Sequence, residues 1–210
     1  MRMRHFFRVS GALVLGLAVP VAAFAQTAAE NRSDADRLRH DLNIATGSTV
    51  CEIGAGSGEL TVLMGQAVGP SGRVMSNDLN PDRRAEISKA AAAAALSNVT
   101  VVEGAADSAN IAPETCDALF MRNVYHHFGD PAAMDATLFQ AVKPGSRIAV
   151  IDFAPRGTES ADPKGRADEA HHGVSSASVI RELQAAGFTD LQASDLQRGV
   201  FIVVGARPSR

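Results

Sequence analysis

The sequence predicts an α/β protein of three layers, in which a mostly parallel seven-stranded sheet lies between helices and ends in a C-terminal antiparallel hairpin. Short β-branched runs alternate with helical patterns along most of the chain. A turn rich in glycine joins the first of these strands to the helix that follows it. The last two strands are joined by Gln197-Arg198-Gly199, which is short enough for a hairpin.

The first half of the domain is predicted from apolar spacing and from the turns between elements. A polar stretch with Leu38, Leu42 and Ile44 on one side indicates a helix. Residues 69–72, Gly-Pro-Ser-Gly, are a strong turn signal, and Pro81 suits the first position of a helix. The expected elements are a helix over 31–44, a strand over 50–53, a helix over 59–68, a strand over 73–77, a helix from Pro81 through the alanines at 90–95, and a strand over 99–103.

The second half continues the alternation and contains one long polar insertion. Asp130 suits a helix cap, and Met134, Leu138 and Val142 form the apolar side of the helix that follows it. Ser175 caps a later helix, which Gly187 ends. The expected elements are a strand over 117–122, a helix from Pro131, a strand over 147–153, the polar insertion over 154–173, a helix to Ala186, and strands over 191–196 and 200–206.

The N-terminus has the layout of a secretory signal peptide. Arg2, Arg4 and Arg8 precede an apolar run over 9–23, and Ala-Phe-Ala at 23–25 is a small-x-small cleavage site. The run is short for a membrane span, which needs about 20 apolar residues. We therefore predict a signal peptide over 1–25, an exported and periplasmic protein, and no stable membrane insertion after cleavage. An uncleaved N-terminal membrane anchor is the alternative.

Length and composition indicate that residues 26–210 form one domain. The composition also indicates which partners are not expected. The 20 Lys and Arg residues are outnumbered by 23 Asp and Glu, and the net charge is −3. There is no Trp and only one Tyr on which bases would stack. A nucleic-acid partner is therefore not expected. The sequence makes no prediction of oligomeric state.

The two cysteines are predicted to be buried thiols. Cys51 lies inside the first strand and Cys116 just before a later one. If these strands are neighbours, the cysteines lie at different heights along them, too far apart for a disulfide. No Cys-x-x-Cys is present and no His/Cys cluster has zinc spacing, so no metal site is expected.

Four segments are predicted to surround one crevice, because ligands of parallel α/β sheets bind outside the carboxyl ends of the strands. Gly54, Gly56 and Gly58 follow the first strand, and Asp78 closes the second. The loop around Asp107 and the segment 123–127 follow later strands. The glycines lack a Cβ atom, so backbone N–H groups and a helix N-terminus can approach a bound small molecule closely.

The motifs at these positions resemble a known family. Residues 52–58 are E-I-G-A-G-S-G, Asp78 lies in S-N-D-L-N-P, and K-P-G-S-R-I-A-V-I-D-F precedes an A-A-G-F helix and the terminal hairpin. Over residues 31–206 the chain thereby resembles the class I S-adenosylmethionine-dependent methyltransferases. The stretch R-N-V-Y-H-H-F is similar to a bacterial subgroup of predicted methyltransferases that often carry export signals. The resemblance implies a Rossmann-like sheet, S-adenosylmethionine as cofactor, and methyl transfer to an acceptor, which we expect to be a small molecule.

The resemblance also implies the residues that hold the cofactor. Asp78 would accept hydrogen bonds from the two ribose hydroxyls, and the glycine turn would lie against the ribose and the methionine end. The acidic residue that often meets the adenine amino group is replaced by Ala105, and Asp107 is the substitute. The predicted cofactor-binding residues are Glu52, Gly54, Ala55, Gly56, Gly58, Asp78, Leu79, Asp107 and Asn123.

Catalytic groups are expected after the fourth predicted strand. His126 and His127 are candidates for a general base, which is needed only if the acceptor starts protonated. Tyr125, together with Asn123, would position the acceptor. His171 and His172 lie in the polar insertion, which would fold over the crevice as a lid. A solvated or hydrogen-bonded loop histidine is the alternative for either pair.

Two other functions compete with methyl transfer. A nicotinamide-dependent oxidoreductase also uses a strand, a glycine turn and a helix, but its fingerprint is G-x-G-x-x-G, and here the third glycine comes one place early. An exported, non-catalytic module of methyltransferase-like fold is the second alternative. The reason for this alternative is that S-adenosylmethionine is made in the cytoplasm, so an exported enzyme would have no obvious supply of it.

Overall fold

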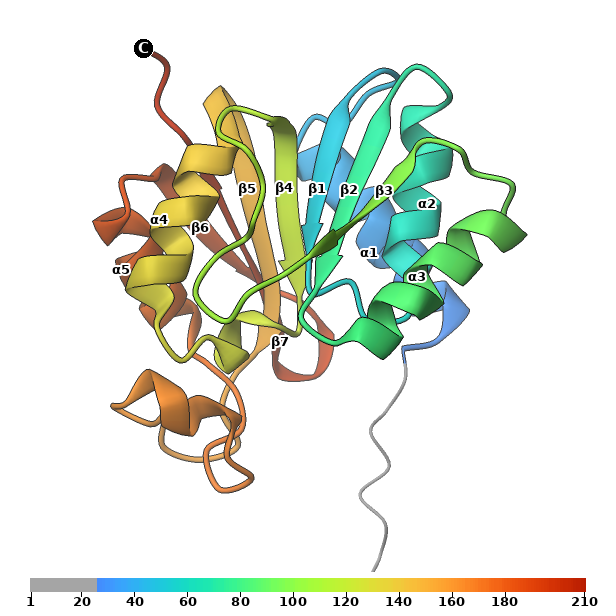
Figure 1. Ribbon diagram of the computed structural model, residues 1–210. Helices are drawn as coiled ribbons and strands as arrows, with labels where there is room; N and C mark the ends of the chain where they lie inside the picture. The colour runs from blue at the N-terminus through green and yellow to red at the C-terminus, as the bar shows by residue number, and fades with distance from the viewer. Residues whose placement is uncertain (1–25) are drawn as a thin grey trace, which may run out of the picture.

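The computed structural model describes residues 26–210, and a seven-stranded sheet runs through its centre (Figure 1). The strand order is β3-β2-β1-β4-β5-β7-β6. Strand β7 is antiparallel to both of its neighbours, whereas the remaining pairs are parallel. The predicted mostly parallel sheet with an antiparallel C-terminal hairpin is confirmed, while the predicted signal peptide over 1–25 lies outside the described residues. The strands are β1 (Thr49–Ile53), β2 (Arg73–Asp78), β3 (Val99–Glu103), β4 (Cys116–Arg122), β5 (Val142–Phe153), β6 (Thr189–Asp195) and β7 (Val200–Ala206).

Helices cover both faces of the sheet (Figure 1). Leu38 of α1 and Met64 of α2 are buried with Val50 and Phe120 on one face. On the other face, Leu138 of α4 and the side chains of α5 are buried with alternate residues of the same strands. Helix α3 packs beside α2. The helices are α1 (Ala28–Asp41), α2 (Glu59–Val68), α3 (Pro81–Ala93), α4 (Pro131–Ala141) and α5 (Ser176–Ala185), with short 3₁₀ turns η1 (Tyr125–His127), η2 (Pro163–Ala167) and η3 (Gln197–Gly199).

The first helix begins earlier than the apolar spacing predicted. It starts at Ala28 because Thr27 and Glu30 form a capping box, in which each side chain bonds the backbone N–H of the other residue. It ends at Asp41, since Asn43 has a φ of +56° and leaves the helical conformation. The capping residues therefore shift the helix from the expected 31–44.

The boundary between α4 and β5 also differs from the prediction. Met134 and Leu138 are buried in α4 as expected, but Val142 is the first residue of β5 and not part of the helix. Between Val142 and Arg147 the pairing of β5 with β4 is irregular, and regular pairing resumes at Arg147. The predicted strand over 147–153 is thus the regular part of β5.

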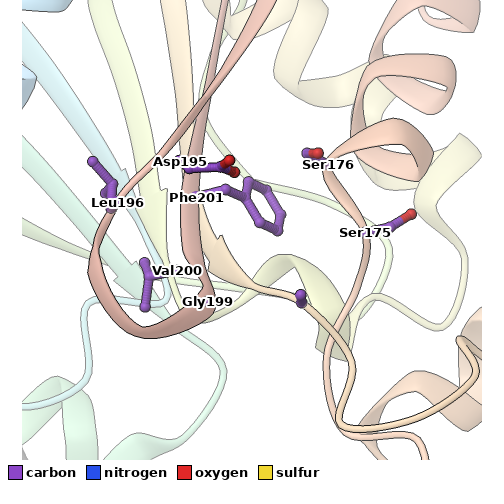
Figure 2. Close-up of a pocket in the computed structure, with 8 residues that line it drawn as sticks. Ser175, Ser176, Asp195, Leu196, Gly199, Val200 and Phe201 are labelled. Atoms are coloured by element: carbon purple, nitrogen blue, oxygen red, sulfur yellow. The ribbon is translucent and has the colours of Figure 1, made fainter.

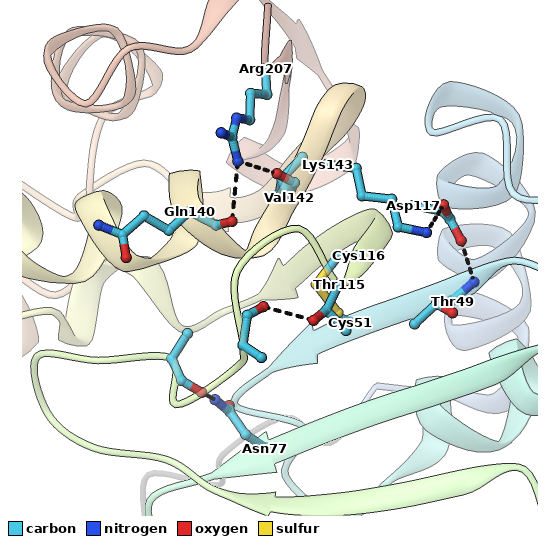
Figure 3. Close-up of a disulfide and its surroundings, with 12 residues drawn as sticks. Thr49, Cys51, Asn77, Thr115, Cys116, Asp117, Gln140, Val142, Lys143 and Arg207 are labelled. Atoms are coloured by element: carbon cyan, nitrogen blue, oxygen red, sulfur yellow. Dashed lines mark hydrogen bonds and ion pairs between the residues drawn. A yellow bond between two sulfur atoms is a disulfide. The ribbon is translucent and has the colours of Figure 1, made fainter. Parts of the chain in front are cut away.

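A disulfide joins Cys51 of β1 to Cys116 of β4 (Figure 3). The prediction of two separate thiols is wrong. Regular pairing does set Cys51 opposite Leu119, some distance along β4 from Cys116. However, the regular pairing of β1 with β4 begins only at Ala118, so it does not fix the position of Cys116. The two Cα atoms lie 5.7 Å apart, which is within the usual range for a disulfide.

Polar contacts hold the start of β4 in place (Figure 3). Asp117 accepts a hydrogen bond of 2.8 Å from the backbone N–H of Thr49 in β1. Its other oxygen lies 2.6 Å from Nζ of Lys143 in β5. Asp117, the residue that follows Cys116, thus bonds to both strands that neighbour β4.

Among residues 26–210, none of the helices has the length and apolar character that crossing a membrane requires.

Candidate functional site

The loop between β1 and α2 has the backbone that its glycines predicted. Gly54, Gly56 and Gly58 have φ values of +66°, +57° and +87°. A Cβ atom on Gly54 would lie 2.5 Å from Cγ2 of Val124, so glycine lets the segment after β4 pack directly on the loop. A Cβ atom on Gly56 would meet nothing within 4 Å, so the loop borders open space there. These two glycines define a close contact on one side of the loop and an opening on the other.

The end of β2 holds this loop through consecutive backbone N–H groups. Gly54 donates to Oδ1 of Asn77 at 3.0 Å, Ala55 to the Asn77 carbonyl at 2.9 Å, and Gly56 to Oδ2 of Asp78 at 3.0 Å. Asn77 is buried, and its Nδ2 also donates to the carbonyl of Ala109. Asn77 therefore connects the glycine loop with the loop after β3. Asn77 was not among the predicted site residues, although its place at the end of a strand beside Asp78 was a signal.

Asp78 lies at the predicted strand end and faces the glycine loop. Besides Gly56, it accepts a hydrogen bond of 2.9 Å from the backbone N–H of Asn80 through Oδ1. Each carboxylate oxygen can accept a second hydrogen bond. The carboxylate therefore orders the loop and retains acceptor capacity for hydroxyl groups, and its predicted role at a ribose stays a prediction.

An apolar and an acidic side chain are exposed beside the glycine loop. Leu79 follows Asp78 and is 61% exposed, which is unusual for a large apolar residue in the described part of the chain. Its backbone lies against Gly104, where a Cβ atom would be 3.4 Å from the Leu79 nitrogen. Asp107 is exposed on the loop that Asn77 anchors at Ala109. The structure thus groups the predicted residues of β2 with the loop after β3.

Glu52 lies beneath the glycine loop and not in the open space beside it. Its carboxylate is buried on the α2 face of the sheet, where it accepts hydrogen bonds from the hydroxyls of Thr61 and Ser76. Burial raises the pKa of Glu52 to about 7, and the two hydroxyls only partly oppose this shift. A contact of this side chain with the cofactor therefore stays a prediction.

The segment after β4 turns sharply beside the glycine loop. Asn123 has a φ of +56°, and its backbone N–H donates to the carbonyl of Ile151 in β5. The 3₁₀ turn η1 follows directly. Tyr125 in this turn is fully buried, and its hydroxyl donates a hydrogen bond of 2.6 Å to Asp135 of α4. The predicted positioning side chain Tyr125 is therefore part of the core and is not available to an acceptor.

Two buried groups share this Tyr125–Asp135 contact. Burial raises the pKa of Tyr125 above its ordinary value and raises the pKa of Asp135 to about 7. The hydroxyl donates to the carboxylate and opposes the shift of Asp135. The pair fixes η1 to α4.

His126 and His127 lie together at the carboxyl ends of β4 and β5. His126 is 1% exposed, and its Nδ1 lies 2.8 Å from Oδ1 of Asp152 in β5. The rings of His126 and His127 are 4.0 Å apart between centroids. Burial and the neighbouring His126 lower the pKa of His127, which favours its neutral form. Asp152 was quoted in the predicted strand but not recognised as a partner of histidine, although an acidic residue inside an apolar run was the available signal.

The polar insertion over 154–173 is anchored beside η1 (below α4 and α5 in Figure 1). Arg166 of η2 is buried and pairs with Glu182 of α5 at 2.6 Å and with Glu159 of the insertion at 3.3 Å. The end of the insertion brings the ring of His172 to 4.9 Å from that of His126. His171 instead faces the carbonyl of Thr158 through its Nδ1. The two predicted lid histidines thus have different surroundings, and only His172 joins His126 and His127.

A hollow of about 400 Å³ opens near the same end of β5, between the start of α5 and the turn from β6 to β7 (Figure 2). Phe201 points into it, and Ser176 and Asp195 add polar atoms to its lining. The predicted glycine loop and histidines do not line this hollow. It lies beyond β5, away from the contacts between β1 and β2 that order the loop.

Comparison with known proteins agrees with this geometry. Residues 50–145 match a family described as "Methyltransferase domain", and this range contains the glycine loop, Asp78 and η1. A ubiquinone/menaquinone biosynthesis C-methyltransferase from Marinomonas sp. is 26% identical over 125 residues, which are 58% of this chain and 50% of that protein. An arsenite methyltransferase from Halobacterium salinarum is 26% identical over 142 residues, 68% of this chain and 36% of that protein. The chain thus spans half or less of the length of these curated relatives.

The same fold occurs in a solved structure. The crystal structure of an S-adenosylmethionine-dependent methyltransferase from Aquifex aeolicus superposes with a TM-score of 0.70 and covers 82% of this chain and 88% of that one. The two sequences are 21% identical, so this likeness concerns the fold alone. Together with the match over residues 50–145, it agrees with the predicted resemblance. Residues 50–145 thus match a methyltransferase domain, and the described residues have the fold of a class I S-adenosylmethionine-dependent methyltransferase.

Proposed function

We propose that this protein binds S-adenosylmethionine in the crevice formed by the glycine loop and the end of β2, and that it transfers the methyl group to a small-molecule acceptor. The observation that carries the proposal is the set of hydrogen bonds from Gly54, Ala55 and Gly56 to Asn77 and Asp78. They order a glycine loop between β1 and the helix α2. The loop also lies where the strand order reverses, between β1 and β4.

The shape and chemistry of these residues fit the cofactor. The open space at Gly56 leaves room for a ligand against the backbone. Asp78 has acceptor capacity for a pair of ribose hydroxyls. Leu79, being exposed and apolar, offers a surface for a flat ring. These residues are the ones we expect to hold S-adenosylmethionine.

The chain contributes mainly by positioning. The cofactor, when bound, supplies a methyl group that its sulfonium already activates. The protein must hold the acceptor in line with that group and exclude other geometries. We place the acceptor between the glycine loop and η1, because Val124 packs on Gly54 and brings η1 beside the loop. His127 is exposed in this turn.

A small acceptor is favoured by the relatives. Their names describe methylation in quinone biosynthesis and methylation of arsenite, both of which concern small molecules. The matches cover half or less of those proteins, so their particular substrates are not transferred to this chain. No observation favours the nicotinamide-dependent oxidoreductase, since the third glycine remains one place early for its fingerprint.

We propose in addition that the protein is exported and loses residues 1–25. The support comes from the charged, apolar and small-residue regions at the N-terminus. The Cys51–Cys116 disulfide supports export independently, because disulfides persist in oxidising compartments such as the periplasm. N-terminal sequencing of the protein from a periplasmic extract tests this. A chain beginning at Gln26 is expected, whereas an intact N-terminus in the membrane fraction would favour the anchored alternative.

If the protein is exported, a second function is a candidate: binding of a ligand or partner by a non-catalytic module of the same fold. Calorimetry with S-adenosylhomocysteine separates the two functions. The enzyme requires saturable binding, and Asp78→Ala should weaken it strongly because the ribose acceptor is lost. Asp36→Ala on the exposed side of α1 is the matched control and should bind normally. Absence of any binding by the wild-type protein would contradict the enzyme and favour the module.

A further inference from the structure

Three histidines from two distant parts of the sequence converge at the carboxyl end of β4. His126 and His127 belong to η1, whereas His172 lies at the end of the insertion after β5. One possible ligand nitrogen from each of the three lies within 4.8 Å of the others. We propose that His126, His127 and His172 bind a divalent transition-metal ion of the kind that prefers imidazole, with Zn²⁺ as the first ion to test. No metal site was predicted from the sequence, because no His/Cys cluster in it has zinc spacing.

Asp152 orients the first of these ligands. The carboxylate is fully buried and accepts hydrogen bonds from the backbone N–H groups of His126 and Phe153, at 3.2 and 2.8 Å. It also lies 2.8 Å from Nδ1 of His126. A carboxylate can only accept from that nitrogen, so Nδ1 carries the proton. A histidine whose second ring nitrogen donates to a carboxylate is the usual arrangement of a metal ligand.

The other ring nitrogen of His126 is then the one left for a ligand. Nε2 is buried and has no hydrogen-bond partner among the described residues. A buried polar atom without a partner is costly, and such atoms are uncommon in folded proteins. In the tautomer that Asp152 selects, Nε2 presents a lone pair, which is what a metal ion requires. A bound cation would satisfy this atom.

The spacing suits a common ion. Zn–N bonds of about 2.1 Å in a tetrahedral site place the nitrogens about 3.4 Å from one another. Nitrogens already within 4.8 Å reach that geometry through small rotations of the rings. Three imidazoles suit Zn²⁺, Cu²⁺ or Ni²⁺ better than the oxygen-preferring Mg²⁺ or Ca²⁺. Three protein ligands also leave one position for water or another small ligand.

Ring packing is the competing explanation. The centroids of His126, His127 and His172 are separated by 4.0, 4.9 and 6.2 Å, and Phe153 lies beside His126 at 4.7 Å. Stacking accounts for the contact between the rings. It provides no partner for Nε2 of His126, and it gives no reason for Asp152 to be buried against the opposite nitrogen. The metal site accounts for both.

The proposed site is separate from the cofactor crevice in its chemistry. None of its ligands belongs to the glycine loop or to β2. Metal binding can therefore be measured without S-adenosylmethionine, and its outcome does not depend on the proposed methyl transfer. A protein that binds Zn²⁺ but not S-adenosylhomocysteine would retain this inference and lose the proposed function, and the reverse result would do the opposite.

Calorimetric titration with Zn²⁺ tests the proposal, using untagged wild-type protein that has been treated with a chelator and then freed of it. One ion per chain is expected. Because His172 is half-buried and lies outside the core, His172→Ala should fold normally and weaken binding at least tenfold. Asp152→Asn should weaken it by about 10- to 100-fold, since it disturbs the orientation of His126. Co²⁺ in place of Zn²⁺ should give the visible absorption bands of a tetrahedral site, and His172→Ala should lose them.

His171→Ala is the matched control. This residue is adjacent to His172 in sequence but contacts the carbonyl of Thr158. Its substitution should leave Zn²⁺ affinity unchanged. The proposal is overturned if wild-type protein binds no Zn²⁺, or if His171→Ala and His172→Ala lose affinity equally.

Discussion

The backbone N–H of Gly56 donates a hydrogen bond of 3.0 Å to Oδ2 of Asp78, so the end of one strand holds the loop that follows its neighbour. The preceding residue of β2, Asn77, holds Gly54 in the same way. Two adjacent side chains therefore hold the loop in this conformation. A loop that is already ordered loses less conformational freedom when it binds.

Asn77→Ala should loosen this loop and weaken S-adenosylhomocysteine binding. The substitution leaves the N–H of Gly54 and the carbonyl of Ala109 without their partner, which should cost about 1–3 kcal/mol of unfolding free energy. Urea unfolding gives the stability and calorimetry gives the affinity.

Asn98→Ala is the control for the Asn77 variant. Asn98 also bonds two backbone groups, the carbonyls of Gly65 and Gly69, but these lie at the far end of α2. It should lower stability by a similar amount and leave the affinity unchanged. Equal losses of affinity in both variants would show that Asn77 acts through general stability alone.

The close contact between Gly54 and Val124 predicts unequal effects of two glycine substitutions. Both Gly54→Ala and Gly56→Ala place a side chain at positive φ, which costs about 1–2 kcal/mol. Only Gly54→Ala adds a clash, because its Cβ would lie 2.5 Å from Val124 Cγ2. Such overpacking adds about 1–3 kcal/mol. Urea unfolding should therefore rank Gly54→Ala as the less stable variant.

A double-mutant cycle tests the origin of this difference. Val124→Ala removes the two methyl groups that lie nearest to the new Cβ, so it should restore part of the stability of Gly54→Ala and none of the stability of Gly56→Ala. Independent, additive effects of Gly54→Ala and Val124→Ala would show that the contact is not the cause.

The disulfide predicts a strong dependence of stability on reduction. A bridge between residues separated by 65 positions restricts the unfolded chain and should contribute about 4 kcal/mol. Adding dithiothreitol during urea unfolding should lower the midpoint of the wild-type protein. The Cys51→Ala/Cys116→Ala double variant should be less stable from the start and insensitive to the reductant. Thiol titration of the denatured, unreduced protein that detects two free thiols would exclude the disulfide.

Much of the fold could be predicted from local signals. Pro81 and Pro131 begin the helices α3 and α4, and the glycines at 54–58 separate β1 from α2. These residues act through their own backbone restrictions, so a single sequence reveals them. The true start of α1 could also be predicted, since Thr27 and Glu30 have capping-box spacing in the sequence. The prediction of 31–44 instead followed the spacing of the apolar residues.

The remaining features depend on contacts between distant residues. The Cys51–Cys116 disulfide depends on how the start of β4 lies against β1, outside their regular pairing, which no spacing in the sequence indicates. His172 reaches His126 only through the path of the insertion, which Arg166 anchors to α5. The sequence therefore predicted which strand ends carry the candidate site. It did not predict which side chains contact one another there.

The buried carboxyl of Glu52 predicts a dependence of stability on pH. Burial raises its pKa to about 7 in the folded protein, from about 4.5 when the chain is unfolded. Between these values the folded state holds a proton that the unfolded state has lost, so unfolding free energy falls as the pH rises from about 4.5 to about 7. Above pH 7 both states are ionised, and this contribution no longer changes. A shift of this size corresponds to on the order of 3 kcal/mol.

Glu52→Gln should remove this contribution, because the amide keeps the shape of the side chain but does not titrate. Relative to the wild-type protein, the variant should gain on the order of 3 kcal/mol between pH 5 and pH 8 in urea unfolding. Asp135, whose pKa is also raised to about 7, titrates in both proteins and cancels in the difference. Glu169→Gln, at an exposed position, should follow the wild-type profile. Parallel pH profiles for Glu52→Gln and the wild-type protein would mean that the buried carboxyl stays ionised, and that its hydrogen bonds from Thr61 and Ser76 outweigh the cost of burial.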